Sequence, residues 1–181
     1  QFVRLNKEGE HYTLLDPQTG AIFNLPTEKR DVRLQIPAGY AWVVYVSDQD
    51  KAEVAYRYAD NLQEERVFSE KWKVSFLKGG AQLPKGRTLS TPTFWTAWND
   101  EVANKFAGEA AYETSFTLAK QGDKGYQLHL GAVGESARVW VNGKDAGIVW
   151  ANPFVVEIGE LLRDGKNEIR IEVANLMANR M

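Results

Sequence analysis

The sequence predicts an all-β protein: a jelly-roll β-sandwich preceded by a smaller β-sheet region. Three observations lead to this prediction. Short runs of alternating apolar and polar residues recur along the chain, and glycine, proline, asparagine and aspartate separate them. The 44% of hydrophobic residues, with six tryptophans among them, can fill a substantial core. The length of 181 residues allows one large β domain or two small ones.

Residues 1–48 are predicted to be the C-terminal strands of a preceding β-sandwich. Four strands of one sheet system are expected, at residues 11–15, 21–25, 32–36 and 40–46. Proline and glycine between the first two supply the fixed and the positive φ of a turn. The run from Tyr40 to Val46 is continuously apolar, which is typical of a strand covered on both faces.

Residues 49–70 are predicted to be a linker, because the stretches around residues 47–50 and 61–66 are highly polar. Residues 52–60 between them fit either a short helix or an edge strand. A domain boundary is therefore expected in this segment.

Residues 71–181 are predicted to form a jelly roll of about eight strands. Five groups of alternating residues define inward faces: Tyr112/Thr114/Phe116/Leu118, Tyr126/Leu128/Leu130, Ala137/Val139/Val141, Phe154/Val156/Ile158 and Ile169/Ile171/Val173. Asn142-Gly143 predicts a two-residue hairpin, because both residues accept positive φ. Asn99 or Asp100 can cap a short helix that runs to Phe106, and Asn175 can bond backbone groups at a strand end.

Composition excludes several classes of protein. A net charge of -2 does not fit a nucleic-acid binder, which carries clustered basic residues. No apolar run approaches the roughly 20 residues of a membrane span. Without cysteine there is no disulfide framework or thiolate metal site. Because the chain opens on Gln1 and stops at Met181 after a strand-like run, we expect a fragment of a longer polypeptide.

A series of motifs in the C-terminal part carries a family resemblance. The motifs are residues 105–116 (KFAGEAAYETSF), 130–133 (LGAV), 137–144 (ARVWVNGK), 150–154 (WANPF), 165–167 (GKN), 171–175 (IEVAN) and 178–180 (ANR). Their order and spacing resemble the galactose-binding-like, sugar-binding jelly roll of glycoside hydrolase families 2 and 106. The closer likeness is to the C-terminal module of family 106, whose members are α-L-rhamnosidases. The turn at residues 16–20 and the Val-rich strand after Gly39 resemble the sandwich that precedes this module.

The resemblance implies a bacterial, polysaccharide-degrading parent enzyme exported to the periplasm or cell surface. In that family the catalytic carboxylates lie in an upstream (β/α)8 barrel. That upstream catalytic domain of the same polypeptide is the expected protein partner, and carbohydrate is the expected ligand.

No catalytic or metal site is predicted within this chain. Hydrolysis of a glycoside needs two carboxylates across a cleft, whereas Glu157, Glu168 and Glu172 lie opposite the apolar faces of their strands, as on a solvated sheet. His11 and His129 have no convergent partners in the sequence. No cofactor is expected, although the loop residues Asp123, Asp145 and Asp164 could contribute oxygen ligands to a structural calcium ion.

The aromatic residues are the main candidates for ligand binding, because flat aromatic faces and a few polar groups recognise sugars. The predicted carbohydrate-binding residues are Trp140, Trp150 and Asn152. Trp140 should point away from the core face of its strand, and Trp150 should lie on a loop rim close to Asn152. Burial of Trp140 against a neighbouring domain is the stronger alternative, since domain contacts also use aromatic residues.

Three functions agree with these observations. The first is a non-catalytic accessory region of a secreted glycoside hydrolase that acts on plant or host polysaccharide. It would brace the catalytic domain and line one edge of its substrate cleft. The second is an autonomous carbohydrate-binding module, and the third is a purely structural or adhesive domain. The fold alone does not choose among them, because jelly rolls host many functions.

Overall fold

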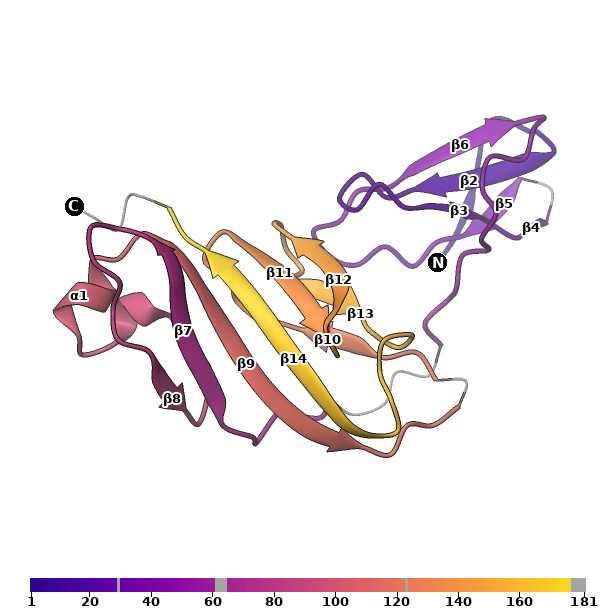
Figure 1. Cartoon of the computed structure of the whole chain (residues 1–181). Helices are drawn as coiled ribbons and strands as arrows, with labels where there is room; N and C mark the ends of the chain where they lie inside the picture. The colour runs from indigo at the N-terminus through magenta and orange to yellow at the C-terminus, as the bar shows by residue number, and fades with distance from the viewer. Residues whose placement is uncertain (29, 61–64, 123, 177–181) are drawn as a thin grey trace. The chain divides into compact units, whose positions relative to one another are not determined.

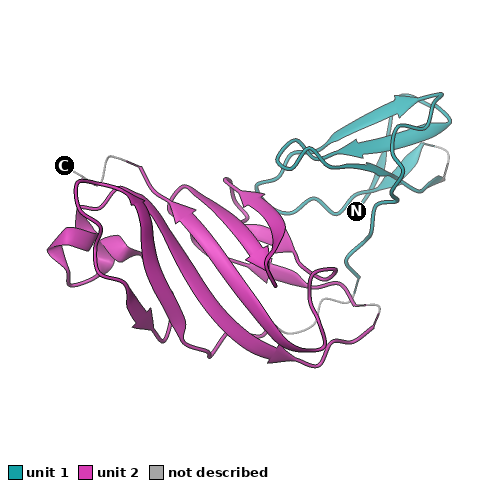
Figure 2. Ribbon diagram, in the orientation of Figure 1, with its two compact units in different colours: residues 1–64 teal, residues 65–181 magenta. Residues whose placement is uncertain are grey.

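The protein divides into two compact units, residues 1–64 and residues 65–181 (Figure 2). The computed structural model describes residues 1–28, 30–60, 65–122 and 124–176. Nearly all of its regular elements are β-strands, which confirms the predicted all-β class (Figure 1). Within the described residues, no helix is both long and apolar enough to span a lipid bilayer.

Unit 1 contains two three-stranded antiparallel sheets, where the sequence predicted one sheet system of four strands. One sheet has the order β1-β5-β4 and the other the order β3-β2-β6. The strands are β1 (Phe2–Arg4), β2 (His11–Leu15), β3 (Ile22–Asn24), β4 (Thr27–Glu28), β5 (Asp31–Arg33) and β6 (Val43–Ser47). A core around Tyr12, Leu14, Leu25 and Val32 lies between them.

The prediction that the run from Tyr40 to Val46 is covered on both faces is wrong. Val44 and Val46 pack against the core, whereas 51% of Val43 and 53% of Tyr45 are exposed. The physical reason is that β6 lies at the edge of a sheet that covers the core of unit 1 with one face. Its outward residues are apolar although they are uncovered, so the sequence shows no alternation.

Residues 52–60 form neither a helix nor a regular strand. Ala55 makes a single parallel bridge with Asn24. Tyr56 packs edge-to-face against Phe23 and Trp42, with ring centroids 5.8 and 5.4 Å apart. This half of the predicted 49–70 linker therefore packs onto unit 1, and the division between the units falls later in the same segment.

Unit 2 is an eight-stranded sandwich with a six-stranded and a two-stranded antiparallel sheet. The larger sheet has the order β12-β11-β14-β9-β7-β8, and β10 pairs with β13. The strands are β7 (Trp72–Gly79), β8 (Arg87–Leu89), β9 (Gly108–Leu118), β10 (Gln127–His129), β11 (Ser136–Val141), β12 (Lys144–Val149), β13 (Val155–Glu157) and β14 (Gly165–Ala174).

The inner face of the six-stranded sheet forms most of the unit 2 core. Trp72, Val74 and Val139 are buried there, and Leu128 and Val156 from the smaller sheet belong to the same cluster. The predicted inward faces are therefore confirmed for β10, β11 and β13. A 3-10 turn η1 (Trp95–Ala97) and a short helix α1 (Glu101–Asn104) close one part of this core.

Three local predictions hold in unit 2. Asn142 and Gly143 have φ of 53° and 76° in the turn between β11 and β12, as a two-residue hairpin requires. Asp100 caps α1 by accepting a 3.0 Å hydrogen bond from the backbone N–H of Ala103. Asn175 accepts a 2.8 Å bond from the N–H of Gly108 at the end of β14.

Candidate functional site

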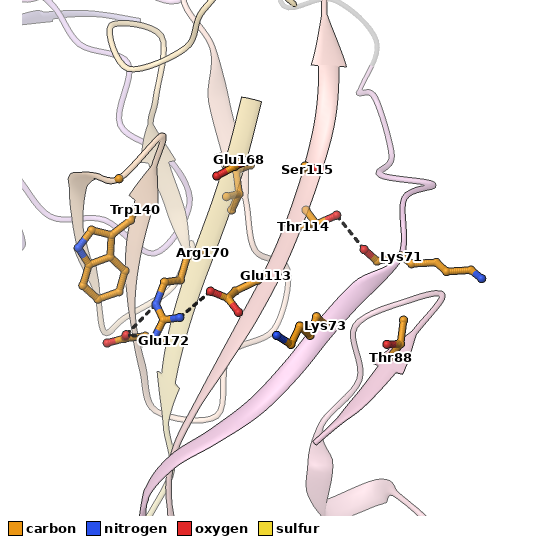
Figure 3. Close-up of a pocket in the computed structure, with 12 residues that line it drawn as sticks. Lys71, Lys73, Thr88, Glu113, Thr114, Ser115, Trp140, Glu168, Arg170 and Glu172 are labelled. Atoms are coloured by element: carbon orange, nitrogen blue, oxygen red, sulfur yellow. Dashed lines mark hydrogen bonds and ion pairs between the residues drawn. The ribbon is translucent and has the colours of Figure 1, made fainter. Parts of the chain in front are cut away.

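A groove of about 750 Å³ lies on the outward face of the six-stranded sheet (Figure 3). The side chains that line it are polar or charged, apart from one aromatic ring, because the side chain of Ile169 belongs to the core. The lining residues are Lys71, Lys73, Thr88, Glu113, Thr114, Ser115, Trp140, Gly143, Glu168, Ile169, Arg170 and Glu172. The groove therefore offers hydrogen-bonding groups and a single indole on the side of the sheet opposite the core.

A row of side chains crosses all six strands of the sheet, and five of its six residues line the groove. Directly opposite residues of neighbouring antiparallel strands point to the same face. The consecutive cross-strand partners are Thr88, Lys73, Glu113, Arg170, Trp140 and Asp145, from β8, β7, β9, β14, β11 and β12. We call these six residues the outward row. Strand register, and not sequence proximity, brings them together.

Arg170 is the charged centre of the groove. Its Nη1 lies 2.6 Å from Oε1 of Glu113, and its Nη2 and Nε lie 2.6 and 2.9 Å from Oε1 of Glu172 (Figure 3). The hydrogen bond to Glu172, followed by that to Glu113, raises the pKa of Arg170 above its ordinary value despite partial burial. Both carboxylates are thus fixed by one guanidinium in a planar, charge-assisted arrangement.

Trp140 lies on the outward face, as the alternation in its strand predicts, and it is half-buried. The guanidinium of Arg138 lies over its ring, 5.3 Å from the centroid, and Arg138 also forms a 2.6 Å ion pair with Asp145. The hydrogen bond that Arg138 donates to Asp145 raises the pKa of Arg138. The Arg138–Asp145 pair therefore holds a cation against the indole and restricts the orientation of the ring.

The groove has the chemistry of a surface that recognises a polar, ring-shaped ligand. The indole offers an apolar face, the Arg170 cluster offers fixed donors and acceptors, and Thr88 and Ser115 add hydroxyl groups. In the described part of the chain, no three His, Asp or Glu side chains are grouped so that they could hold a metal ion.

The other sequence-predicted residues lie elsewhere. Trp150 is 57% exposed and Asn152 is exposed in the loop before β13, and neither lines the groove. Of the three predicted carbohydrate-binding residues, the structure brings Trp140 alone into the groove.

The proposed calcium ligands are not gathered in one place. Asp145 pairs with Arg138, and Asp164 accepts a 3.0 Å bond from the backbone N–H of Lys120. Asp123 lies outside the described residues. His129 is exposed on β10, and His11 lies at the start of β2 in unit 1.

Sequence reasoning missed Lys73, Glu113 and Arg170 as members of one site. Alternation in β9 and β14 places Glu113 and Arg170 opposite the apolar face, which gives their side of the sheet. The pairing of these two residues, 57 positions apart, comes from strand order, which local patterns do not contain.

Comparison with known proteins relates the chain to glycoside hydrolases. No family model matches it. A putative beta-glucuronidase of Formosa agariphila is 32% identical over 113 residues, which are 61% of this chain and 10% of that protein. A rhamnosidase from Novosphingobium sp. PP1Y has a similar structure, with a TM-score of 0.75 and 30% identity over 99% of this chain and 17% of that chain.

A β-glucuronidase from Ruminococcus gnavus, solved with D-glucuronic acid, shares the fold of part of the chain. The match has a TM-score of 0.52 and 21% identity, and it covers 65% of this chain and 23% of that one. The chain thus spans 10% of the length of the curated relative and 17% of that of the rhamnosidase.

Proposed function

We infer that this chain is a non-catalytic accessory β-sandwich region of a secreted bacterial glycoside hydrolase resembling the family 106 α-L-rhamnosidases. In this proposal, a catalytic domain elsewhere in the same polypeptide hydrolyses plant or host polysaccharide in the periplasm or at the cell surface. Unit 2 is a galactose-binding-like jelly roll that braces this domain and contacts the substrate through its groove.

The observation that carries the proposal is the extent of the likeness to the rhamnosidase. The match includes 99% of this chain, so it covers both units, yet it accounts for 17% of the rhamnosidase chain. Such a relation is expected of a region that accompanies a catalytic domain.

The carboxylates of the groove support a non-catalytic role. A glycosidase needs two carboxyl groups roughly 5–9.5 Å apart, and one of them must hold a proton to give to the leaving group. Glu113 and Glu172 both bind Arg170 instead. The guanidinium occupies the space between the two carboxylates and bonds an oxygen of each, so a glycosidic bond cannot lie between them.

An assay of hydrolysis tests this proposal. The purified chain is incubated with 4-nitrophenyl α-L-rhamnoside and with 4-nitrophenyl β-D-glucuronide, and the release of nitrophenol is followed. We expect no release above that of buffer. Turnover that disappears in Glu113→Gln or Glu172→Gln would contradict the proposal, whereas turnover unchanged in both variants would indicate a contaminating enzyme.

A second candidate function, glycan binding by the chain alone, is favoured by the position of Trp140 beside the Arg170 cluster. The volume of about 750 Å³ is in the usual range of ligand sites, roughly 300–1,000 Å³. A glycan that lies along the outward row would stack one ring on the indole and bond its hydroxyls to Arg170 and Lys73. Trp150 and Asn152 would contact the glycan at a second place, outside the groove.

A glycan array tests this second function. Specific retention of the chain by rhamnose-containing oligosaccharides would support it. No retention on any glycan would leave a bracing or purely structural role for the groove.

A further inference from the structure

Unit 1 carries an apolar surface on the outward face of the β3-β2-β6 sheet. Leu15 of β2 pairs with Ile22 of β3 on one side and with Val43 of β6 on the other, so these three side chains form one row. They point away from the core, because the alternate residues of β2 are the ones that fill it. Ile22 is 44% exposed, Val43 is 51% exposed and the next outward residue of β6, Tyr45, is 53% exposed.

The strand next to this surface has an unpaired edge. β6 pairs with β2 on one side and is the last strand in its sheet. Within the described part of unit 1, the residues of β6 make no backbone hydrogen bond other than those to β2. Residues 40–47 contain no charge and no proline, which are the features that normally protect a sheet edge from pairing.

We propose that β6 pairs with one further β-strand, supplied by a segment of the same polypeptide outside residues 1–181, whose alternate apolar side chains cover Val43 and Tyr45. An extended backbone is the ligand that fits a row of unpaired N–H and C=O groups. The uncharged surface selects apolar side chains on the face that the new strand shares with Ile22 and Leu15.

The source of the strand rests on the proposed accessory role. In the matched rhamnosidase, this region is 17% of the chain, so most of that polypeptide lies outside it. A strand supplied in cis has a high effective concentration, which suits an edge that must be covered permanently. The added strand extends the β3-β2-β6 sheet to four strands, and this sheet is then one complete layer of a sandwich to which unit 1 contributes.

Amide hydrogen exchange tests the proposal. The full chain is extended at Gln1 by a flexible Gly/Ser linker and an eight-residue strand that alternates threonine and valine. The matched control has the same linker and a strand with proline at alternate positions, which cannot pair. We expect those amides of residues 43–47 that face away from β2 to exchange at least tenfold more slowly in the first fusion than in the second. Equal rates in the two fusions would overturn the proposal.

Surface variants give a second test that does not depend on glycan binding or hydrolysis. Replacing Val43 and Tyr45 together by lysine should abolish the protection, because it removes the apolar contact. Ile36→Lys, at another exposed site of unit 1, should preserve it. If the unmodified chain forms a dimer that Val43→Lys dissolves, the surface belongs to a second copy and the proposal of a cis strand is wrong.

Discussion

The side-chain amide of Asn142 donates a 2.8 Å hydrogen bond to the side-chain oxygen of Asn167, which is fully buried. Asn142 lies in the β11–β12 turn, and its own side-chain oxygen accepts a 3.0 Å bond from the N–H of Glu168. Asn167 also bonds the N–H and C=O of Arg163 and the C=O of Gly165. The two asparagines therefore tie the hairpin turn to the start of β14, the strand that carries Arg170.

Asn167→Ala should lower the free energy of unfolding of unit 2 by about 3 kcal/mol, because it leaves several buried backbone groups without partners. Urea titration followed by tryptophan fluorescence measures this change, since five of the six tryptophans belong to unit 2. Asn99→Ala, at an exposed position, is the control and should cost less than about 0.5 kcal/mol. A similar small cost for both variants would show that the asparagine network does not stabilise the fold.

Asp100 should contribute to stability mainly as the cap of α1. Asp100→Ala removes the bond to Ala103 and the 2.9 Å ion pair with Arg87, and we expect a loss of about 1 kcal/mol. Asp100→Asn keeps a capping oxygen and removes the charge. If the cap dominates, urea titration will show a much smaller loss for Asn than for Ala. Equal losses would assign the effect to the ion pair with Arg87 instead.

The free energy of unfolding of unit 2 should fall at high pH because of Tyr112. Burial raises its pKa to about 12 from the ordinary value of 10.0, and its hydroxyl donates a 3.0 Å bond to the carbonyl of Thr93. Below about pH 9 the phenol is protonated in both states, so this group adds no pH dependence there. Between about pH 10 and 12 the unfolded chain loses the proton and the folded protein keeps it, so stability falls as pH rises.

Urea titrations at several pH values between 9 and 12 measure this fall. Tyr112→Phe has no titrating group at this position and should show a shallower decline across the same interval, from a lower starting stability because Thr93 loses its donor. Parallel declines in the two proteins would exclude Tyr112 as the cause.

The local features of unit 2 could be predicted from the sequence wherever one residue type satisfies a local backbone requirement. Asn142 and Gly143 are such a case, because a two-residue hairpin needs positive φ at both positions. The outward direction of Trp140 followed from the alternation in its strand. Asn167 was not distinguished, because an asparagine after a glycine turn has the pattern of an ordinary turn residue.

The groove and the apolar surface of unit 1 depend on strand order, which local patterns do not determine. Glu113 and Arg170 meet because β9 and β14 are neighbours in register. The run from Tyr40 to Val46 could not be placed correctly either. Its outward residues Val43 and Tyr45 are apolar although they are exposed in the described structure. The run therefore lacks the alternation of apolar and polar residues that would have revealed a one-sided strand.

Calorimetric titration of the chain with rhamnose-containing oligosaccharides tests most directly the claim that the groove contacts the substrate. The comparison uses Trp140→Ala and, as a matched control, Trp150→Ala, an exposed tryptophan outside the groove. We expect the wild type and Trp150→Ala to bind alike and Trp140→Ala to bind about two- to tenfold more weakly, since stacking on an aromatic ring contributes roughly 0.5–1.5 kcal/mol. Binding that survives Trp140→Ala and disappears in Trp150→Ala would contradict the assignment of the groove.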